Sequence, residues 1–169
     1  MKNQNPPANK STRGNASQFF VAGELCRRGW VAVVTMGNTP TTDILCSNAE
    51  GTRFVHVQVK TFVPGNKTVT VGRKAEIDNG SNFVWVLAGI PTAESRTGFE
   101  YYIIPSADVA KNVANLHQKW LRTPGKDGQP HQDSNVRAIH LPPYKDVPAW
   151  DVGVYRDNWS LFAELLGRP

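Results

Sequence analysis

Apolar and polar residues alternate along residues 53–61, and this is the clearest pattern in the chain. The three valines of the segment fall on one face, because successive side chains of a strand point to opposite faces of the sheet. Gln58 and Lys60 fall on the other face, with Cβ atoms roughly 6.5–7 Å apart. The pattern predicts a strand with an apolar core face and a polar face that ends in an amide and a cation.

Two further strands are expected before this one. Residues 42–46 form a short strand that places Asp43 on one face, and residues 30–36 are β-branched and apolar, which is typical of a buried strand. Short turns separate the three segments, so we expect an antiparallel meander.

Helical spacing of apolar residues predicts one helix over residues 15–28 and another over residues 106–120. Glu24 is the only charge in the interior of the first helix and lies beside its apolar stripe. An acid there is costly to bury unless a cation or a metal meets it. The alternative is a surface glutamate paired with Arg27 or Arg28, three or four positions further on.

The rest of the chain completes a single domain. Residues 82–90 are apolar almost throughout, which is typical of a central strand buried on both faces. The fold class is therefore α/β (α+β). We expect a flexible basic N-terminal arm over residues 1–14, followed by one domain over residues 15–169.

One helix acid, one strand acid and the tripeptide Gln58-Val59-Lys60 follow one another in this order. This arrangement resembles the PD-(D/E)XK nuclease superfamily, over roughly residues 15 to 105. The resemblance implies a restriction-endonuclease-like αβββαβ core, with a mixed central sheet flanked by helices and with extra C-terminal elements. Two positions depart from the usual signature: Thr42 stands where proline is common, and Gln58 stands where an acid is common, although the superfamily contains a glutamine variant.

The resemblance also implies a divalent-metal-dependent endonuclease that hydrolyses DNA with Mg²⁺ or Mn²⁺. It assigns catalytic roles to Glu24, Asp43, Gln58 and Lys60, and makes the first three, with the Val59 carbonyl, the metal ligands. Two carboxylates give the ion a charge of −2 where a glutamate at position 58 would give −3, so we expect weak metal binding that a substrate phosphate completes. Lys60 would orient or deprotonate the attacking water.

Charge is consistent with a polyanionic partner, since the formal net charge is +5. Cutting both strands of a duplex takes two sites, so a homodimer is expected. The sequence shows no signal peptide and no run long enough to span a bilayer, and the expected location is cytoplasmic. The cations that could contact a DNA backbone are Lys10, Arg13, Lys67, Arg73, Lys74, Lys119 and Arg122.

Two other functions stay open at this point. The first is a catalytically inactive nucleic-acid- or partner-binding protein on the same fold, in which Gln58 marks a lost active site. The second is a structural or immunity-type interaction protein, in which Asp43 and Lys60 only form a salt bridge between neighbouring strands.

Overall fold

The computed structural model describes residues 10–35 and 39–168. Helix α1 (Lys10–Arg27) begins five residues earlier than the helical pattern predicts. The last five residues of the expected flexible arm are therefore helical, and its first nine lie outside the described residues.

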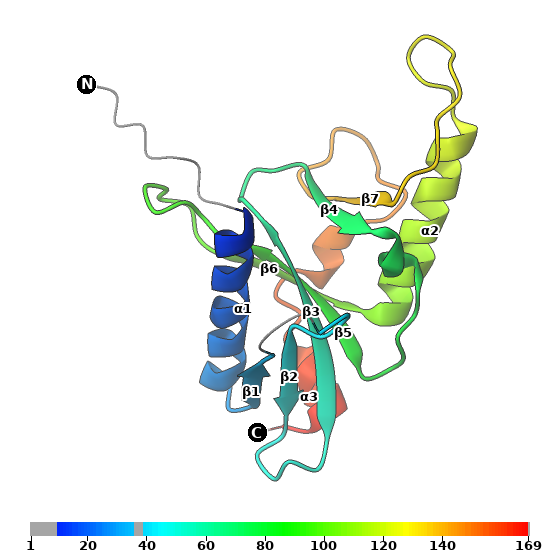
Figure 1. Ribbon diagram of the computed structural model, residues 1–169. Coiled ribbons are helices and arrows are strands. Elements are labelled where there is room, and N and C mark those ends of the chain that lie inside the picture. The colour runs from blue at the N-terminus through cyan, green and yellow to red at the C-terminus, as the bar shows by residue number, and fades with distance from the viewer. Residues whose placement is uncertain (1–9, 36–38, 169) are drawn as a thin grey trace.

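A five-stranded mixed sheet forms the centre of the molecule (Figure 1). Its order is β1-β2-β3-β5-β6, and every neighbouring pair is antiparallel except β3 and β5, which are parallel. The expected meander and the α+β class are confirmed. The strands are β1 (Val31–Val34), β2 (Ile44–Ser47), β3 (Phe54–Phe62), β5 (Phe83–Gly89) and β6 (Glu100–Pro105).

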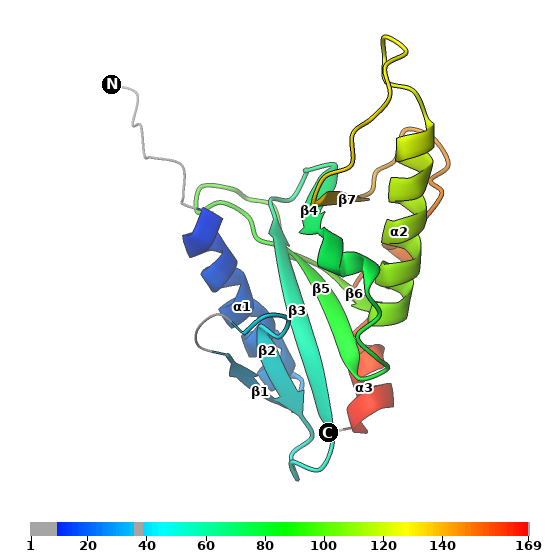
Figure 2. The ribbon, with the colours of Figure 1, turned by 45° about the vertical axis from the view of Figure 1, so that its right-hand side comes forward.

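The two faces of the sheet are covered differently. Helices α1 and α3 (Ser160–Leu166) pack on the face that carries the valines of β3. The opposite face packs against α2 (Ser106–Arg122) and a two-stranded antiparallel ribbon of β4 (Thr68–Gly72) and β7 (Val136–His140). Figure 2 shows this ribbon near one end of β3, with α2 alongside it. None of the helices in the described residues is long and apolar enough to cross a membrane.

Strand β1 differs from its sequence prediction. Its β-branched residues predict a buried strand, but β1 is the edge of the sheet, where Val31 and Val33 are 47% and 58% exposed. A short strand shows the same β-branched composition at an edge as in a centre, so composition alone does not give its place. Met36, the last residue of the predicted strand, lies outside the described residues.

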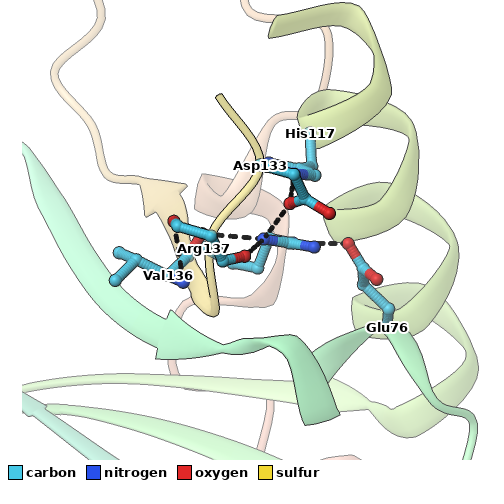
Figure 3. Close-up of polar contacts among 6 residues, drawn as sticks. Glu76, His117, Asp133, Val136 and Arg137 are labelled. Carbon is cyan, nitrogen blue, oxygen red and sulfur yellow. Dashed lines mark hydrogen bonds and ion pairs between the residues drawn. The ribbon is translucent and has the colours of Figure 1, made fainter. Parts of the chain in front are cut away.

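The connection between the parallel strands β3 and β5 carries β4 and the short 3₁₀ helix η1 (Arg73–Glu76). A buried arginine of β7, Arg137, holds this crossover in place (Figure 3). Its guanidinium donates to the Glu76 carboxylate and to the carbonyls of Ser134 and Val136, and it lies 3.4 Å from Asp133. A buried cation needs such partners, so η1 and β7 are fixed relative to each other.

Asp133 extends the same network to α2. Its Oδ1 lies 2.8 Å from Nε2 of His117, a residue of α2 that is only 8% exposed. The network therefore joins three parts of the chain, which are η1 through Glu76, α2 through His117, and the segment before β7 through Asp133 (Figure 3).

We predict that Glu76→Ala lowers the free energy of unfolding by about 2–3 kcal/mol, because it removes the nearer of the two carboxylates beside the buried Arg137 guanidinium. Urea denaturation followed by circular dichroism measures this difference. The control is Glu94→Ala in an exposed loop, which should change stability by no more than about 0.5 kcal/mol. Equal effects of the two substitutions would show that the buried pair does not hold the crossover.

Candidate active site

The site forms where β3 runs on beyond its partner β2. The last residue pair between the two strands is Ile44 with Val57, so Val59 has no backbone partner on that edge. The Val59 N–H instead donates to Asp43 Oδ2, at 2.7 Å. The N–H and C=O of one strand residue point to the same edge, so the Val59 carbonyl lies on this side too, where it accepts from Gln58 Nε2 at 3.5 Å.

Asp43 is anchored by its own backbone just before β2. Its N–H donates to the Val57 carbonyl, and its C=O accepts from Thr35, both at 2.9 Å. The bond to Val57 is one residue out of the β2–β3 register, in which Ile44 faces Val57, and the Asp43 carboxylate accepts from the Gln58 amide. The two side chains consequently lie on the same face, as the alternating pattern predicts.

Two amides donate to the Asp43 carboxylate. Gln18 Nε2, from α1, lies 3.1 Å from Oδ1, and Gln58 Nε2 donates to Oδ2 together with the Val59 N–H. Burial raises the pKa of Asp43 above its usual value, and this outweighs the opposite effects of the Val59 N–H, the Lys60 charge and the Gln58 amide. The site thus holds one partly desolvated acid surrounded by neutral donors.

Lys60 shares the Gln58 face of β3 and is half-buried. Its Nζ lies 5.9 Å from the centre of the Trp85 ring on the neighbouring strand β5. The ion pairs of the described residues do not include one between Lys60 and Asp43. The hypothesis that Asp43 and Lys60 only form a structural salt bridge between neighbouring strands is therefore wrong.

Glu24 is not placed as the resemblance implies. Its carboxylate pairs with Arg27, at 3.0 Å, and with Arg28, and the hydrogen bond from Arg27 lowers the pKa of Glu24. Glu24 follows Gln18 by six positions, which is about 9 Å along the helix and roughly 120° around it. The α1 residue that reaches Asp43 is Gln18, so the local ion pair is the correct alternative for Glu24.

Sequence reasoning missed two residues of this region, Gln18 and Trp85. Gln18 is an uncharged residue of a helix and has no signal in the sequence that separates it from a surface amide. Trp85 lies inside an apolar run, where only its indole N–H distinguishes it from the neighbouring core residues. Among the described residues, no group of three or more His, Cys, Asp or Glu side chains is placed to hold a metal ion.

No family model matches the sequence, and no curated protein matches it either. Among solved structures, the chain is similar to the bacterial homing endonuclease I-Ssp6803I, with 16% identity, 94% of each chain covered and a TM-score of 0.56. It also matches Hjc, a Holliday junction resolvase of Archaeoglobus fulgidus, with 14% identity over 75% of this chain and 83% of that chain, and a TM-score of 0.42.

The chain has the restriction-endonuclease-like fold. The likeness to the homing endonuclease confirms the expected fold.

The basic residues expected to contact DNA lie in three places on this fold. Lys67 precedes β4, Arg73 and Lys74 belong to η1, and Lys119 and Arg122 lie in the last turn of α2. All five are exposed, whereas Arg13, in α1, is half-buried and the Lys10 side chain lies outside the described residues. Among those whose side chains the structure describes, Lys74 is the one that lines a pocket together with Gln58 and Lys60.

We predict that Asp43→Asn raises the thermal unfolding midpoint at pH 7. A carboxyl whose pKa is raised in the folded state lowers stability once it ionises, and this loss disappears as the pH falls through the folded-state pKa. The asparagine oxygen can accept from Val59 and Gln58, and its NH₂ can face a rotated Gln18 amide.

The measurement is a series of thermal unfolding curves for both proteins between pH 4 and pH 8. The gap between Asp43→Asn and the wild type should narrow toward acidic pH. Asp43→Ala is the control, and it should unfold earlier than the wild type because it leaves the Val59 N–H without an acceptor. If Asp43→Asn has a lower unfolding midpoint than the wild type across the whole pH range, the ionised Asp43 carboxylate stabilises the folded state, and the prediction is wrong.

Proposed function

We propose that this protein is a divalent-metal-dependent endonuclease that hydrolyses phosphodiester bonds in DNA. One observation carries the proposal. The Asp43 carboxylate, the Gln58 amide and the Val59 backbone meet at one point of β3. Lys60 lies on the same face of the strand. The fold shared with a homing endonuclease supports this assignment.

The donor set suits a hard cation, which prefers oxygen ligands. Asp43 offers a carboxylate and Val59 a backbone carbonyl. Gln58 offers its side-chain carbonyl after a half-turn of the amide, because the NH₂ end now faces Asp43. Since Glu24 pairs elsewhere, the set carries a charge of −1, and affinity for the free ion should be lower than the sequence predicts. Phosphate oxygens of the substrate would complete the shell.

A bound Mg²⁺ or Mn²⁺ would lower the pKa of a coordinated water and offset the negative charge of the phosphodiester. Lys60 supplies a compact positive charge on the same face, where it would orient the attacking water and stabilise charge that develops on the phosphate. Gln18 and the Val59 N–H hold Asp43 in one orientation. The protein's part in the reaction is then to position a nucleophile and to offset charge.

A second function is favoured by the hydrogen bonds at Asp43. Gln18 and Gln58 already satisfy its carboxylate without a cation, and the nearby α1 residue is an amide where an acid would strengthen metal binding. This is the arrangement expected of a protein that binds DNA on this fold without cutting it.

Nicking of supercoiled plasmid in Mg²⁺ or Mn²⁺ tests the first function. We expect Asp43→Ala and Lys60→Ala each to lower the rate by about a hundredfold or more, as loss of a charged group in the active site does. Glu24→Ala is the matched control and should keep the wild-type rate, because Glu24 lies with Arg27 and Arg28. DNA retention without nicking, weakened steeply by salt, would establish the second function instead.

The substitution Gln58→Glu distinguishes a site that binds metal weakly from a site that no longer binds metal. The substitution adds a carboxylate opposite Asp43, so we expect tighter Mn²⁺ binding by calorimetry, by about tenfold, since hard-cation affinity follows ligand charge. Gln58→Met is the control, because it keeps the length of the side chain and offers no oxygen. Mn²⁺ affinity that is unchanged in both variants would contradict a metal site at this position.

A further inference from the structure

A small pocket of about 130 Å³ lies beside Asp43, between η1 and the face of β3 and β5 that carries Gln58. Lys60 and Trp85 form one part of its wall, and Lys74 of η1 forms another. Gln58 lines this pocket and also donates to Asp43, so the two places share a side chain. The pocket has room for a group the size of a phosphate and not for a nucleoside.

Trp85 lies in the wall of the pocket and is 4% exposed. Its indole N–H has no hydrogen-bond partner in the part of the chain that the structure describes, as is also the case for Trp150 and Trp159. Of these three tryptophans, Trp85 is the one that lines this pocket. Its indole N–H signal therefore reports on a ligand that binds there.

The charges around the pocket have one sign. Lys60 and Lys74 both line it, and no aspartate or glutamate is among the residues of its wall. The Lys60 ammonium lies toward Trp85 and makes no ion pair with Asp43, so its charge is available on this side. Two cations in a wall without an aspartate or glutamate favour an anion with several oxygens.

The crossover from β3 to β5 keeps Lys74 in this position. Lys74 is two residues before Glu76, whose carboxylate pairs with the buried Arg137. The backbone of η1 is therefore fixed by a network that does not involve Asp43 (Figure 3). The pocket has one wall from the catalytic strand and one from the ribbon.

We propose that this pocket binds a phosphate group of the DNA backbone, next to the phosphodiester at Asp43, with Lys60 and Lys74 as its ligands and Trp85 in its wall. The identity of the ligand as DNA rests on the proposed function; the affinity for phosphate does not. Lys74 is a positioning residue that sets where the strand lies relative to Asp43.

Inorganic phosphate and the metal-free, ¹⁵N-labelled full chain provide the test. Each of the five tryptophans gives one indole N–H signal in a nitrogen–proton NMR spectrum, and Trp85→Phe identifies the signal of Trp85. We expect this signal to move and to saturate as phosphate is added at constant ionic strength. Lys74→Ala should weaken the apparent affinity about tenfold, as loss of a charged hydrogen bond does.

Lys111→Ala, which removes an exposed lysine of α2, is the matched control and should leave the affinity unchanged. A Trp85 signal that stays in place while phosphate is added overturns the proposal, and so does equal weakening by Lys74→Ala and Lys111→Ala. The spectra of the two lysine variants show directly that each is folded.

A short DNA duplex in EDTA distinguishes the two sources of phosphate. If the ligand is the DNA backbone, the duplex moves the same indole signal at lower concentration than inorganic phosphate, and Lys74→Ala weakens both. A signal that only inorganic phosphate moves would overturn the assignment to DNA. Neither titration requires cleavage, so failure of plasmid nicking leaves this result intact, and nicking without phosphate binding would refute this proposal alone.

Discussion

The candidate site depends on a backbone amide that has lost its strand partner. Strand β2 pairs with β3 only as far as Val57, and the Asp43 side chain then takes the place of the missing strand by accepting from the Val59 N–H. The same break leaves the Val59 carbonyl on an open edge. An acid and a carbonyl therefore meet because one strand is shorter than its neighbour, and the Gln58 face of β3 lies directly beside them.

Two networks with different physical character surround this edge. At Asp43, neutral amides from α1 and β3 contact a single partly buried acid, whose pKa is raised by burial. At the ribbon, a buried arginine is matched by the Glu76 carboxylate and by backbone carbonyls. At Asp43, the negative charge of the carboxylate is only partly compensated. At the ribbon, the buried ion pair of Arg137 and Glu76 fixes the backbone of η1 relative to β7.

The sequence predicts the part of the site that lies on strands and misses the part that depends on a helix. Period-two alternation is enough to put Gln58 and Lys60 on one face of β3 and to place Asp43 on one face of the short segment before it. The helix contribution depends on rotation about the α1 axis, and local pairing with Arg27 and Arg28 takes Glu24 away from the site. The edge position of β1 and the unpartnered indole of Trp85 result from sheet order and packing, which no short pattern encodes.

The parallel pairing of β3 with β5 has an evolutionary consequence. The chain must leave the sheet between them, and the excursion carries β4 and η1 back past the polar face of β3. Insertions or deletions in this excursion would reshape the surface beside Gln58 and Lys60 while β3 keeps its register. One change of loop length would in this way alter which ligand reaches the candidate site, with Asp43 and Lys60 untouched.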